Sequence, residues 1–221
     1  MADTPGASGS LDIVLDMDLS KRASELADRN LALLDRHGVR AIDVLGSVGS
    51  GKTTLISELI LRLKGRLRIG AIAGDITTRI DAGRIEEQGV PVVQIQTGGA
   101  CHLDGKLVRR ALERLDLAEL DLVIIENVGN LICPAAFPVG AHSRLLVLSV
   151  TEGPWMAVKH PIMVRQADVV VINKIDLADA MEVDVERLTA DVRQTHPGIA
   201  VIPTCARAGE GIDDVIAALG L

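Results

Sequence analysis

The sequence contains almost no aromatic side chains. In 221 residues there is no tyrosine, one phenylalanine and one tryptophan, whereas proteins that bind single-stranded nucleic acid stack bases on aromatic rings. Basic residues are in the minority, 23 against 30 acidic ones, and they form no cluster, so the formal net charge is -7. A dedicated binder of nucleic acid or of anionic membranes is therefore excluded, because both need concentrated positive charge.

Long apolar runs and a cysteine framework are also missing. The runs at 122–125 and 169–172 are among the longest, and a membrane-spanning helix needs about 20 apolar residues. The first residues are small and polar, without the basic and apolar regions of a signal peptide. We therefore expect a cytoplasmic protein without a membrane partner. Three cysteines are an odd and small number, which favours free thiols or metal ligands over disulfides.

From residue 39 onward, short aliphatic runs alternate with helix-like stretches. Near-continuous Val, Ile and Leu runs are typical of parallel strands that helices cover on both faces. We predict an α/β fold with a doubly wound, mostly parallel sheet in a single domain over 19–221, which includes a helix near 20–37 and follows a flexible N-terminal arm over 1–18. The predicted strands are 41–45, 67–73, 91–96, 121–126, 144–150, 168–173 and 199–203, and the predicted helices are 52–64, 80–88, 104–115, 155–166, 182–194 and 211–219.

The first predicted strand leads into the sequence GSVGSGKT, a full match to the phosphate-binding pattern GxxxxGK(S/T) ahead of a helix. Glycines let successive backbone N–H groups face phosphates at the helix N-terminus. The lysine supplies a positive charge to the β and γ phosphates, and the threonine hydroxyl can ligate Mg²⁺. The predicted phosphate contacts are Gly46, Ser47, Val48, Gly49, Ser50, Gly51, Lys52, Thr53 and Thr54.

The base is predicted from NKxD, formed by Asn173, Lys174 and Asp176 at the end of an apolar strand. Asp176 can accept two hydrogen bonds from guanine, and adenine offers no such donor pair, so a site built this way rejects the wrong base strongly. Cys205 and Ala206 follow the next strand, in a segment similar to the SAK loop of GTPases. We expect their backbone to reach guanine O6, and hence GTP and GDP as ligands.

Two acids follow strands where a magnesium-phosphate centre needs them, Asp75 and Glu126. With Thr53 they are the predicted Mg²⁺ ligands, because Mg²⁺ prefers oxygen donors. The predicted catalytic residues are Lys52, Asp75 and Glu126, and the segment 77–81 is the predicted first switch. No glutamine stands where it would orient a water molecule, so we expect slow GTP hydrolysis.

Cys101 and His102 form an adjacent pair just before the helix predicted near 104–115. A helix N-terminus lowers the pKa of a thiol and favours the metal-binding thiolate. Cys133 lies seven residues after Glu126, on another loop at the carboxyl edge of the sheet, where ligands gather. The residues alone leave two interpretations: a metal site that is open or shared between subunits, or buried structural cysteines beside a surface histidine.

The segments TGGACHLD, IIENVGNLICPAAFPVG and VVVINKIDL, together with the phosphate loop, resemble the HypB family over residues 38–219. These are nickel-inserting GTPases of nickel-iron hydrogenase maturation, in the signal-recognition and MinD-like (SIMIBI) class of P-loop GTPases. The resemblance implies a GTP-dependent homodimer in which Cys101, His102 and Cys133 bind Zn²⁺ or Ni²⁺ at the dimer interface. It also implies two partners, the hydrogenase large subunit and a small HypA-like nickel chaperone.

Three alternatives remain at this point. UreG, the urease GTPase, shares the fold but has Cys-Pro-His at its interface, whereas Cys133-Pro134 is followed here by Ala135. A P-loop kinase would need an adenine pocket, against which NKxD argues. A regulatory GTPase switch would carry the cysteines incidentally. Some HypB members store nickel on an N-terminal cysteine motif or histidine tract, which is not expected here because residues 1–40 contain no cysteine and only His37.

Overall fold

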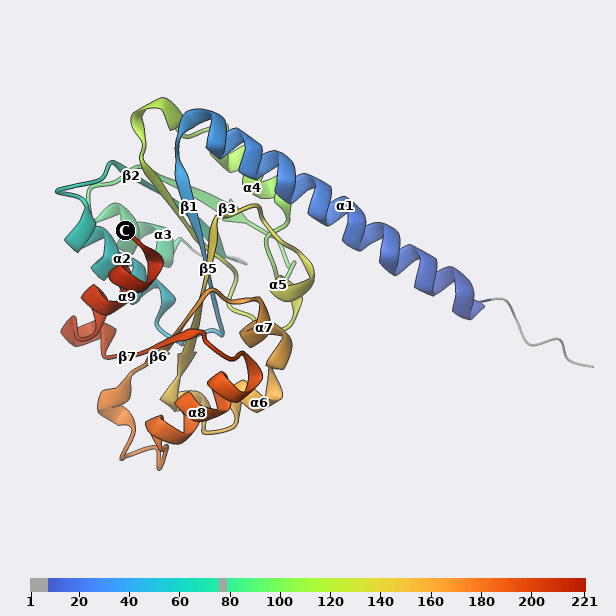
Figure 1. Ribbon diagram of the computed structural model, residues 1–221. Coiled ribbons are helices and arrows are strands. Elements are labelled where there is room, and N and C mark those ends of the chain that lie inside the picture. Colours follow the sequence, from blue (N-terminus) through green and yellow to red (C-terminus); the bar gives the residue numbers. More distant parts are fainter. Residues whose placement is uncertain (1–7, 76–78) are drawn as a thin grey trace, which may run out of the picture.

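The computed structural model describes residues 8–75 and 79–221. Seven strands form one sheet in the order β3-β2-β4-β1-β5-β6-β7, and every neighbouring pair is parallel. The sheet predicted as mostly parallel is thus parallel throughout (Figure 1). The strands are β1 (Arg40–Gly46), β2 (Ile69–Asp75), β3 (Val92–Gln96), β4 (Leu122–Glu126), β5 (Ser143–Ser149), β6 (Val169–Asn173) and β7 (Ala200–Thr204).

Helices cover both faces of the sheet, as a doubly wound fold requires. The helices are α1 (Ser8–His37), α2 (Lys52–Leu63), α3 (Ile80–Glu86), α4 (Gly105–Leu112), α5 (Cys133–Ala136), α6 (Met156–Lys159), α7 (Pro161–Gln166), α8 (Val185–Thr195) and α9 (Ile212–Leu219). Short 3-10 helices lie at Leu117–Glu119, Val150–Glu152, Ile175–Leu177 and Ala206–Ala208. α2, α3 and α9 pack on one face, and α1, α4 and α5 to α8 lie on the other (Figure 1).

The central strand β1 shows why the sequence folds in this way. Its side chains alternate between the faces, so Ile42 and Val44 pack under α2 while Ala41 and Leu45 pack on the opposite side. All four are buried. A strand whose two faces are both covered must be apolar on both, which explains the unbroken aliphatic runs of the sequence.

Two helix predictions need correction. α1 begins at Ser8 rather than near residue 20, so the part of the expected flexible arm from Ser8 onward is helical, and residues 1–7 lie outside the described residues. No proline falls between Pro5 and Pro91, so nothing in the sequence interrupts helical hydrogen bonding there. The helix predicted over 155–166 is two helices, α6 and α7, which meet at His160. Pro161 lacks the N–H that would continue the first helix.

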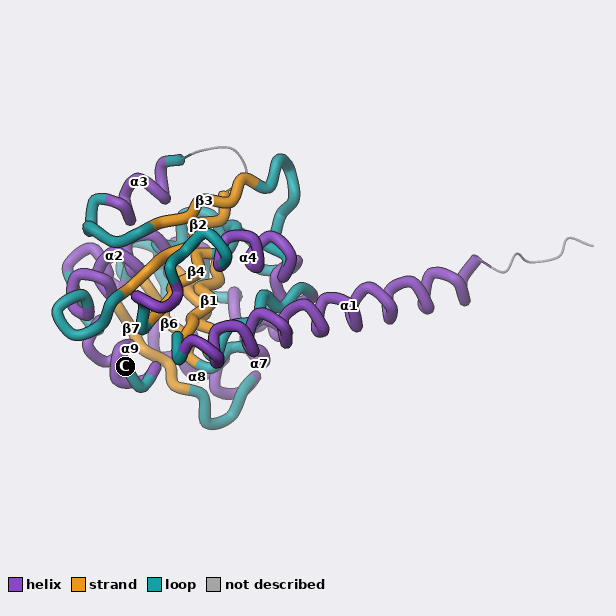
Figure 2. Tube along the Cα trace, turned by 90° about the horizontal axis from the view of Figure 1, so that it is seen from above, coloured by secondary structure: helices purple, strands orange, loops and turns teal. Residues whose placement is uncertain are grey.

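The helix α1 crosses the sheet beside α4 and then extends beyond the body of the protein (Figure 2). Its C-terminal part is packed, since Leu34 is fully buried in the cluster beneath α4. Among the described helices, α1 included, none has the length and apolar character to cross a membrane.

The sheet topology sets where a ligand binds. From β1 the chain runs through α2, on one face, to β2, and from β4 it runs through α5, on the other face, to β5. The crossovers diverge at the carboxyl ends of the neighbouring strands β1 and β4. In open α/β sheets such a point is the usual ligand-binding crevice. The predicted phosphate loop and Glu126 both lie there.

Candidate nucleotide and metal site

The phosphate loop joins Gly46, the last residue of β1, to Lys52, the first residue of α2. Gly46 and Gly51 have φ angles of 155° and 99°. A Cβ atom on Gly51 would lie 2.3 Å from Asn173 Nδ2, and one on Gly46 would lie 2.6 Å from the carbonyl oxygen of Val147. Only glycine fits at these two positions, and its small size lets the loop backbone lie close to β5 at Gly46 and to Asn173 of β6 at Gly51.

Lys52 is buried at the floor of this loop. Its Nζ donates to the carbonyl oxygens of Gly46, at 3.2 Å, and Ser47, at 2.9 Å. Burial lowers the pKa of Lys52, and the neighbouring carboxylates, Glu126 first, oppose that shift. A buried ammonium group gains from an anionic ligand that replaces its lost hydration, which suits Lys52 to phosphate binding.

Thr53, Glu126 and Asp81 meet beside the phosphate loop. The Thr53 hydroxyl lies 2.8 Å from Glu126 Oε1 and 2.9 Å from Asp81 Oδ1. The single hydrogen of the Thr53 hydroxyl can be donated to only one of the two carboxylates at a time. The oxygen atoms of the three residues lie close together, and oxygen donors of this kind fit Mg²⁺.

Glu126 is the most buried acid of this group. Burial raises its pKa to about 7, although Lys52 and Thr53 both act to lower it. Its second oxygen, Oε2, is buried without a hydrogen-bond partner in the described part of the chain. A divalent cation would supply the missing charge and a ligand bond to this carboxylate.

The acids border a cavity of about 420 Å³ at the carboxyl edge of the sheet. Asp75, the last residue of β2, lines it together with Lys52, Thr53 and Glu126. The structure thus brings the predicted magnesium ligands Thr53, Asp75 and Glu126 together with Lys52 around one cavity. Sequence reasoning missed Asp81 as an oxygen donor, because it placed the residue only within the first switch. Residues 77 and 78 of that switch lie outside the described residues.

Asn173 joins the phosphate loop to the base-binding loop. Its Nδ2 donates to the carbonyl of Ser50 at 2.9 Å, and its Oδ1 accepts from Thr204 Oγ1 and the Ala206 N–H, both at 3.1 Å. The Ala206 N–H predicted to contact guanine O6 therefore donates to Asn173 in this structure. The side chain acts as a brace between three segments that are distant in sequence.

Lys174 and Asp176 complete the predicted base-binding motif. Lys174 takes a left-handed conformation, with φ 63°, and its Nζ donates to the Gly49 carbonyl at 2.6 Å. Asp176 is exposed at the edge of the sheet. Burial, with a hydrogen bond to Asp176, raises the pKa of the Cys205 thiol. Cys205 is thus an immediate neighbour of the carboxylate predicted to recognise guanine.

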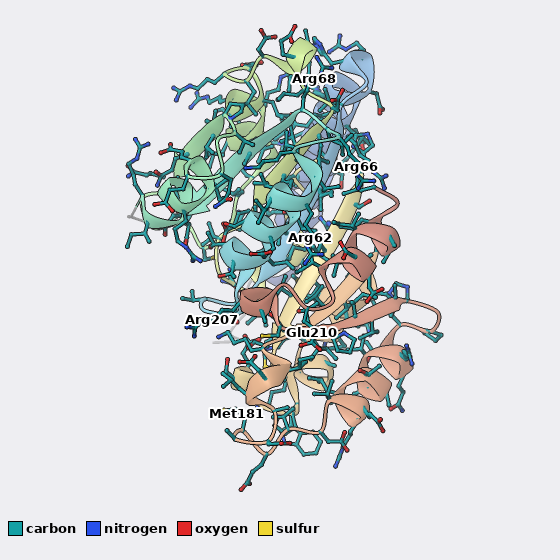
Figure 3. The ribbon with its side chains drawn as sticks, turned by 90° about the vertical axis from the view of Figure 1, so that its left-hand side faces the viewer. Arg62, Arg66, Arg68, Met181, Arg207 and Glu210 are labelled. Carbon is teal, nitrogen blue, oxygen red and sulfur yellow. The ribbon has the colours of Figure 1, made fainter. Side chains whose placement is uncertain are left out.

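The base-binding loop is also tied to α2. Arg62 of α2 donates to the Gly209 carbonyl at 2.7 Å and pairs with Asp213 of α9. Figure 3 shows Arg62 on the same side of the molecule as Arg207 and Glu210, which belong to this loop. The helix that starts at the phosphate loop therefore also anchors the loop that follows β7.

Cys101, His102 and Cys133 come together although two loops carry them. Their donor atoms all lie within 4.8 Å of one another. The sulfurs of Cys101 and Cys133 are 2.7 Å apart, and Cys101 Sγ lies 3.9 Å from His102 Nδ1. Both cysteines are free. Two sulfurs and an imidazole are donors that suit Zn²⁺ or Ni²⁺, and three ligands leave a tetrahedral position open.

Phe137 is a member of this site that sequence reasoning missed. Its ring stacks on the His102 imidazole with 3.9 Å between centroids and 16° between planes. The only phenylalanine of the chain therefore links the loop after β4 to the Cys-His loop. Phe137 is close to Cys133 in the sequence, which was a signal that it lies near the metal site, but no periodic pattern in the sequence pairs Phe137 with His102.

The two metal-binding cysteines stand differently with respect to the neighbouring helices. Asp104 caps α4 by accepting from the Leu107 N–H at 2.7 Å, so Cys101 and His102 lie just before the helix, where the sequence placed them. Cys133 does begin a helix, the short α5. Its pKa is nevertheless raised, mainly by its hydrogen bond with Cys101 and then by burial.

Comparison with known proteins agrees with this geometry. Residues 40–203 match the family model for the CobW/HypB/UreG nucleotide-binding domain. The chain is 48% identical over 208 residues to the probable hydrogenase maturation factor HypB of Methanocaldococcus jannaschii, covering 94% of this chain and 93% of that one. The chain belongs to the HypB family.

Solved HypB structures share the fold. The crystal structure of the hydrogenase maturation factor HypB from Archaeoglobus fulgidus has a TM-score of 0.84 and 38% identity, over 90% of this chain and 98% of that one. HypB from Helicobacter pylori in complex with nickel has the same TM-score and 31% identity, over 90% and 93% of the two chains. The P-loop GTPase fold predicted from the sequence, and the resemblance to HypB, are confirmed.

Proposed function

We propose that this chain is a nickel-handling GTPase of hydrogenase maturation. The observation that carries the proposal is the juxtaposition of two sites: the Cys101, His102 and Cys133 cluster lies on the loops that leave the same sheet edge as the phosphate loop. Relatives named hydrogenase maturation factors, one of them solved with nickel, support the same function. The UreG-like, kinase and incidental-cysteine alternatives have no comparable support.

The nucleotide ligands are GTP and GDP with Mg²⁺. Lys52 neutralises the phosphates, Asp176 selects guanine, and Thr53, Asp75 and Glu126 hold the magnesium ion or its water shell. Hydrolysis to GDP and phosphate is slow, because no glutamine is among the described residues that line the phosphate cavity. The carboxylates of Glu126 and Asp81 both lie within hydrogen-bond distance of the Thr53 hydroxyl, so magnesium binding and nucleotide binding are mutually dependent.

The metal site is completed by a second subunit. Three donors are too few for a closed tetrahedral site, so sulfur shared across a two-fold interface supplies the remainder. Binding of GTP favours this homodimer, and hydrolysis releases it and the Ni²⁺ or Zn²⁺. The metal then passes in the cytoplasm between a small HypA-like chaperone and the hydrogenase large subunit, the partners that membership of this family suggests.

A nickel titration of native protein and Cys133→Ala tests the metal assignment. Removal of one of three donors is expected to weaken Ni²⁺ binding at least tenfold, since even the loss of groups that only orient metal ligands costs 10- to 100-fold. GTP binding, measured in parallel by calorimetry, is expected to be unchanged because the phosphate loop is intact. Equal nickel affinity in both proteins would contradict the assignment.

A further inference from the structure

A buried polar pair lies beneath the Cys-His loop, outside every site predicted from the sequence. Asp43 of β1 and Asn127, the residue after Glu126, are both fully buried. Asn127 Nδ2 donates to Asp43 Oδ1 at 3.0 Å. The second Asp43 oxygen has no hydrogen-bond partner within the described ranges. Burial of a carboxyl group inside a central strand lowers the stability of the folded protein, so we explain the presence of Asp43 by a role in function and not in stability.

Asp43 fixes how the Asn127 amide is oriented. A carboxylate only accepts hydrogen bonds, so the NH₂ group of Asn127 must face it. The amide oxygen then points the other way, where it accepts from the Leu103 N–H at 3.2 Å and the Val128 N–H at 3.0 Å. The amide therefore has a single orientation, which a neutral apolar neighbour would not enforce.

The same amide connects the two functional sites. Asn127 follows Glu126, whose carboxylate contacts Thr53, and Leu103 follows His102. The hydrogen bond between Leu103 and Asn127 therefore links the loop that carries two metal donors to the residue next to the phosphate-side acid Glu126. No other side chain is needed to span this distance.

The side chain of Leu103 strengthens the connection to the phosphate edge. It is fully buried and packs on Gly74 of β2, where a Cβ atom would come within 2.8 Å of Leu103 Cδ1. Gly74 precedes Asp75, the second phosphate-side acid. The Cys-His loop is thus attached to the ends of both strands that carry the predicted magnesium ligands.

A second buried amide holds the metal loops but does not touch the phosphate edge. Asn30 of α1 donates to the carbonyls of Gly105, at 2.7 Å, and Val139, at 2.8 Å. These residues lie just after the Cys-His pair and after the Cys133 loop. Asn30 therefore ties both metal loops to α1, and it provides a matched control for Asn127.

We infer that Asn127, oriented by Asp43, is a positioning residue that couples the nucleotide state at Glu126 to the metal-binding geometry of Cys101 and His102. This inference rests on the proposed function, in which GTP and metal bind to one protein. The coupling is the ratio of two nickel dissociation constants, one with GDP and Mg²⁺ and one with a non-hydrolysable GTP analogue and Mg²⁺. Couplings between sites are typically about 5- to 150-fold.

The test measures this ratio with Ni²⁺ as the probe, from the absorbance of the nickel-thiolate complex. Asn127→Leu removes all three side-chain hydrogen bonds of Asn127 and is expected to bring the ratio close to one. Because Asn127 also borders the phosphate cavity, both dissociation constants are measured at saturating nucleotide. Asn30→Leu is expected to weaken nickel binding by the same factor with either nucleotide, so that the ratio stays at the native value. If Asn127→Leu does not fold, Asn127→Ala takes its place.

The exchanged pair Asp43→Asn with Asn127→Asp provides the rescue. Asn at position 43 would donate to the new carboxylate, which can still accept from the Leu103 and Val128 N–H groups, so the native ratio is expected to return. A native ratio in Asn127→Leu, or failure of the folded exchanged pair to restore it, would overturn this role alone. A ratio of one in the native protein would overturn nucleotide-metal coupling itself, while its GTP and nickel affinities would still report on the proposed function.

Discussion

Replacement of Asp43 by asparagine is expected to stabilise the protein at neutral pH. Burial raises the pKa of Asp43 from 3.8 to about 6, even though Arg144 and the hydrogen bond from Asn127 act to lower it. A shift of about two units corresponds to about 3 kcal/mol. Because the folded-state pKa of Asp43 is raised, this contribution to the free energy of unfolding is fully present below pH 3.8 and is lost as the pH rises through about 6. Asparagine keeps an acceptor for Asn127 and removes the charge.

The assay is urea unfolding of native protein and Asp43→Asn, followed by circular dichroism between pH 4 and pH 8. The two proteins should differ little in free energy of unfolding at pH 4. At pH 8 the variant should be more stable by up to about 3 kcal/mol, a large fraction of the 5–15 kcal/mol typical of a domain. A difference that does not change with pH, or a variant that is less stable at pH 8, would refute the argument that Asp43 is a charge buried at a cost.

Two further predictions concern the nucleotide. Asp176→Asn should shift the preference from guanine towards xanthine nucleotides, whose 2-oxo group replaces a donor by an acceptor, and equal GTP and ATP affinity of the native protein in calorimetry would contradict the guanine assignment. Lys52→Ala should abolish tight triphosphate binding or phosphate release and leave the circular dichroism spectrum unchanged, since Lys52 supplies charge to the phosphates; native turnover in the variant would refute its role.

The phosphate and base motifs could be predicted because local backbone geometry requires their residues. Gly51 must be glycine, since Asn173 approaches it too closely for a Cβ atom, and the contact is made by two motifs that sequence patterns already identify. The strands could be predicted for a related reason. A sheet covered on both faces needs aliphatic runs, and 169–172 is such a run.

The sequence predicted which residues form the metal site but not how far apart they lie. Spacing placed Cys101, His102 and Cys133 on loops at the same sheet edge, but their distances depend on how those loops are held. The Asn30 amide holds them through a contact with Val139, 109 positions away, and no periodic pattern in a single sequence indicates such a pair.

The errors at helix ends have different causes. The break between α6 and α7 had a signal in Pro161, which the apolar pattern around it outweighed. The start of α1 also had a signal, since Leu11, Val14 and Leu15 stand at helical spacing, but the small and polar residues that precede them favoured an arm. Asp81 was overlooked as a ligand because its approach to Thr53 depends on the placement of α3 rather than on a strand end.

We propose that the nucleotide state controls a metal site shared between two subunits. The most direct test measures nickel content and molar mass by light scattering, for the native protein with GDP and then with a non-hydrolysable GTP analogue. We expect a monomer with weakly held nickel in the presence of GDP, and a dimer with nickel bound at its interface in the presence of the analogue. The same mass and the same nickel content with both nucleotides would contradict it.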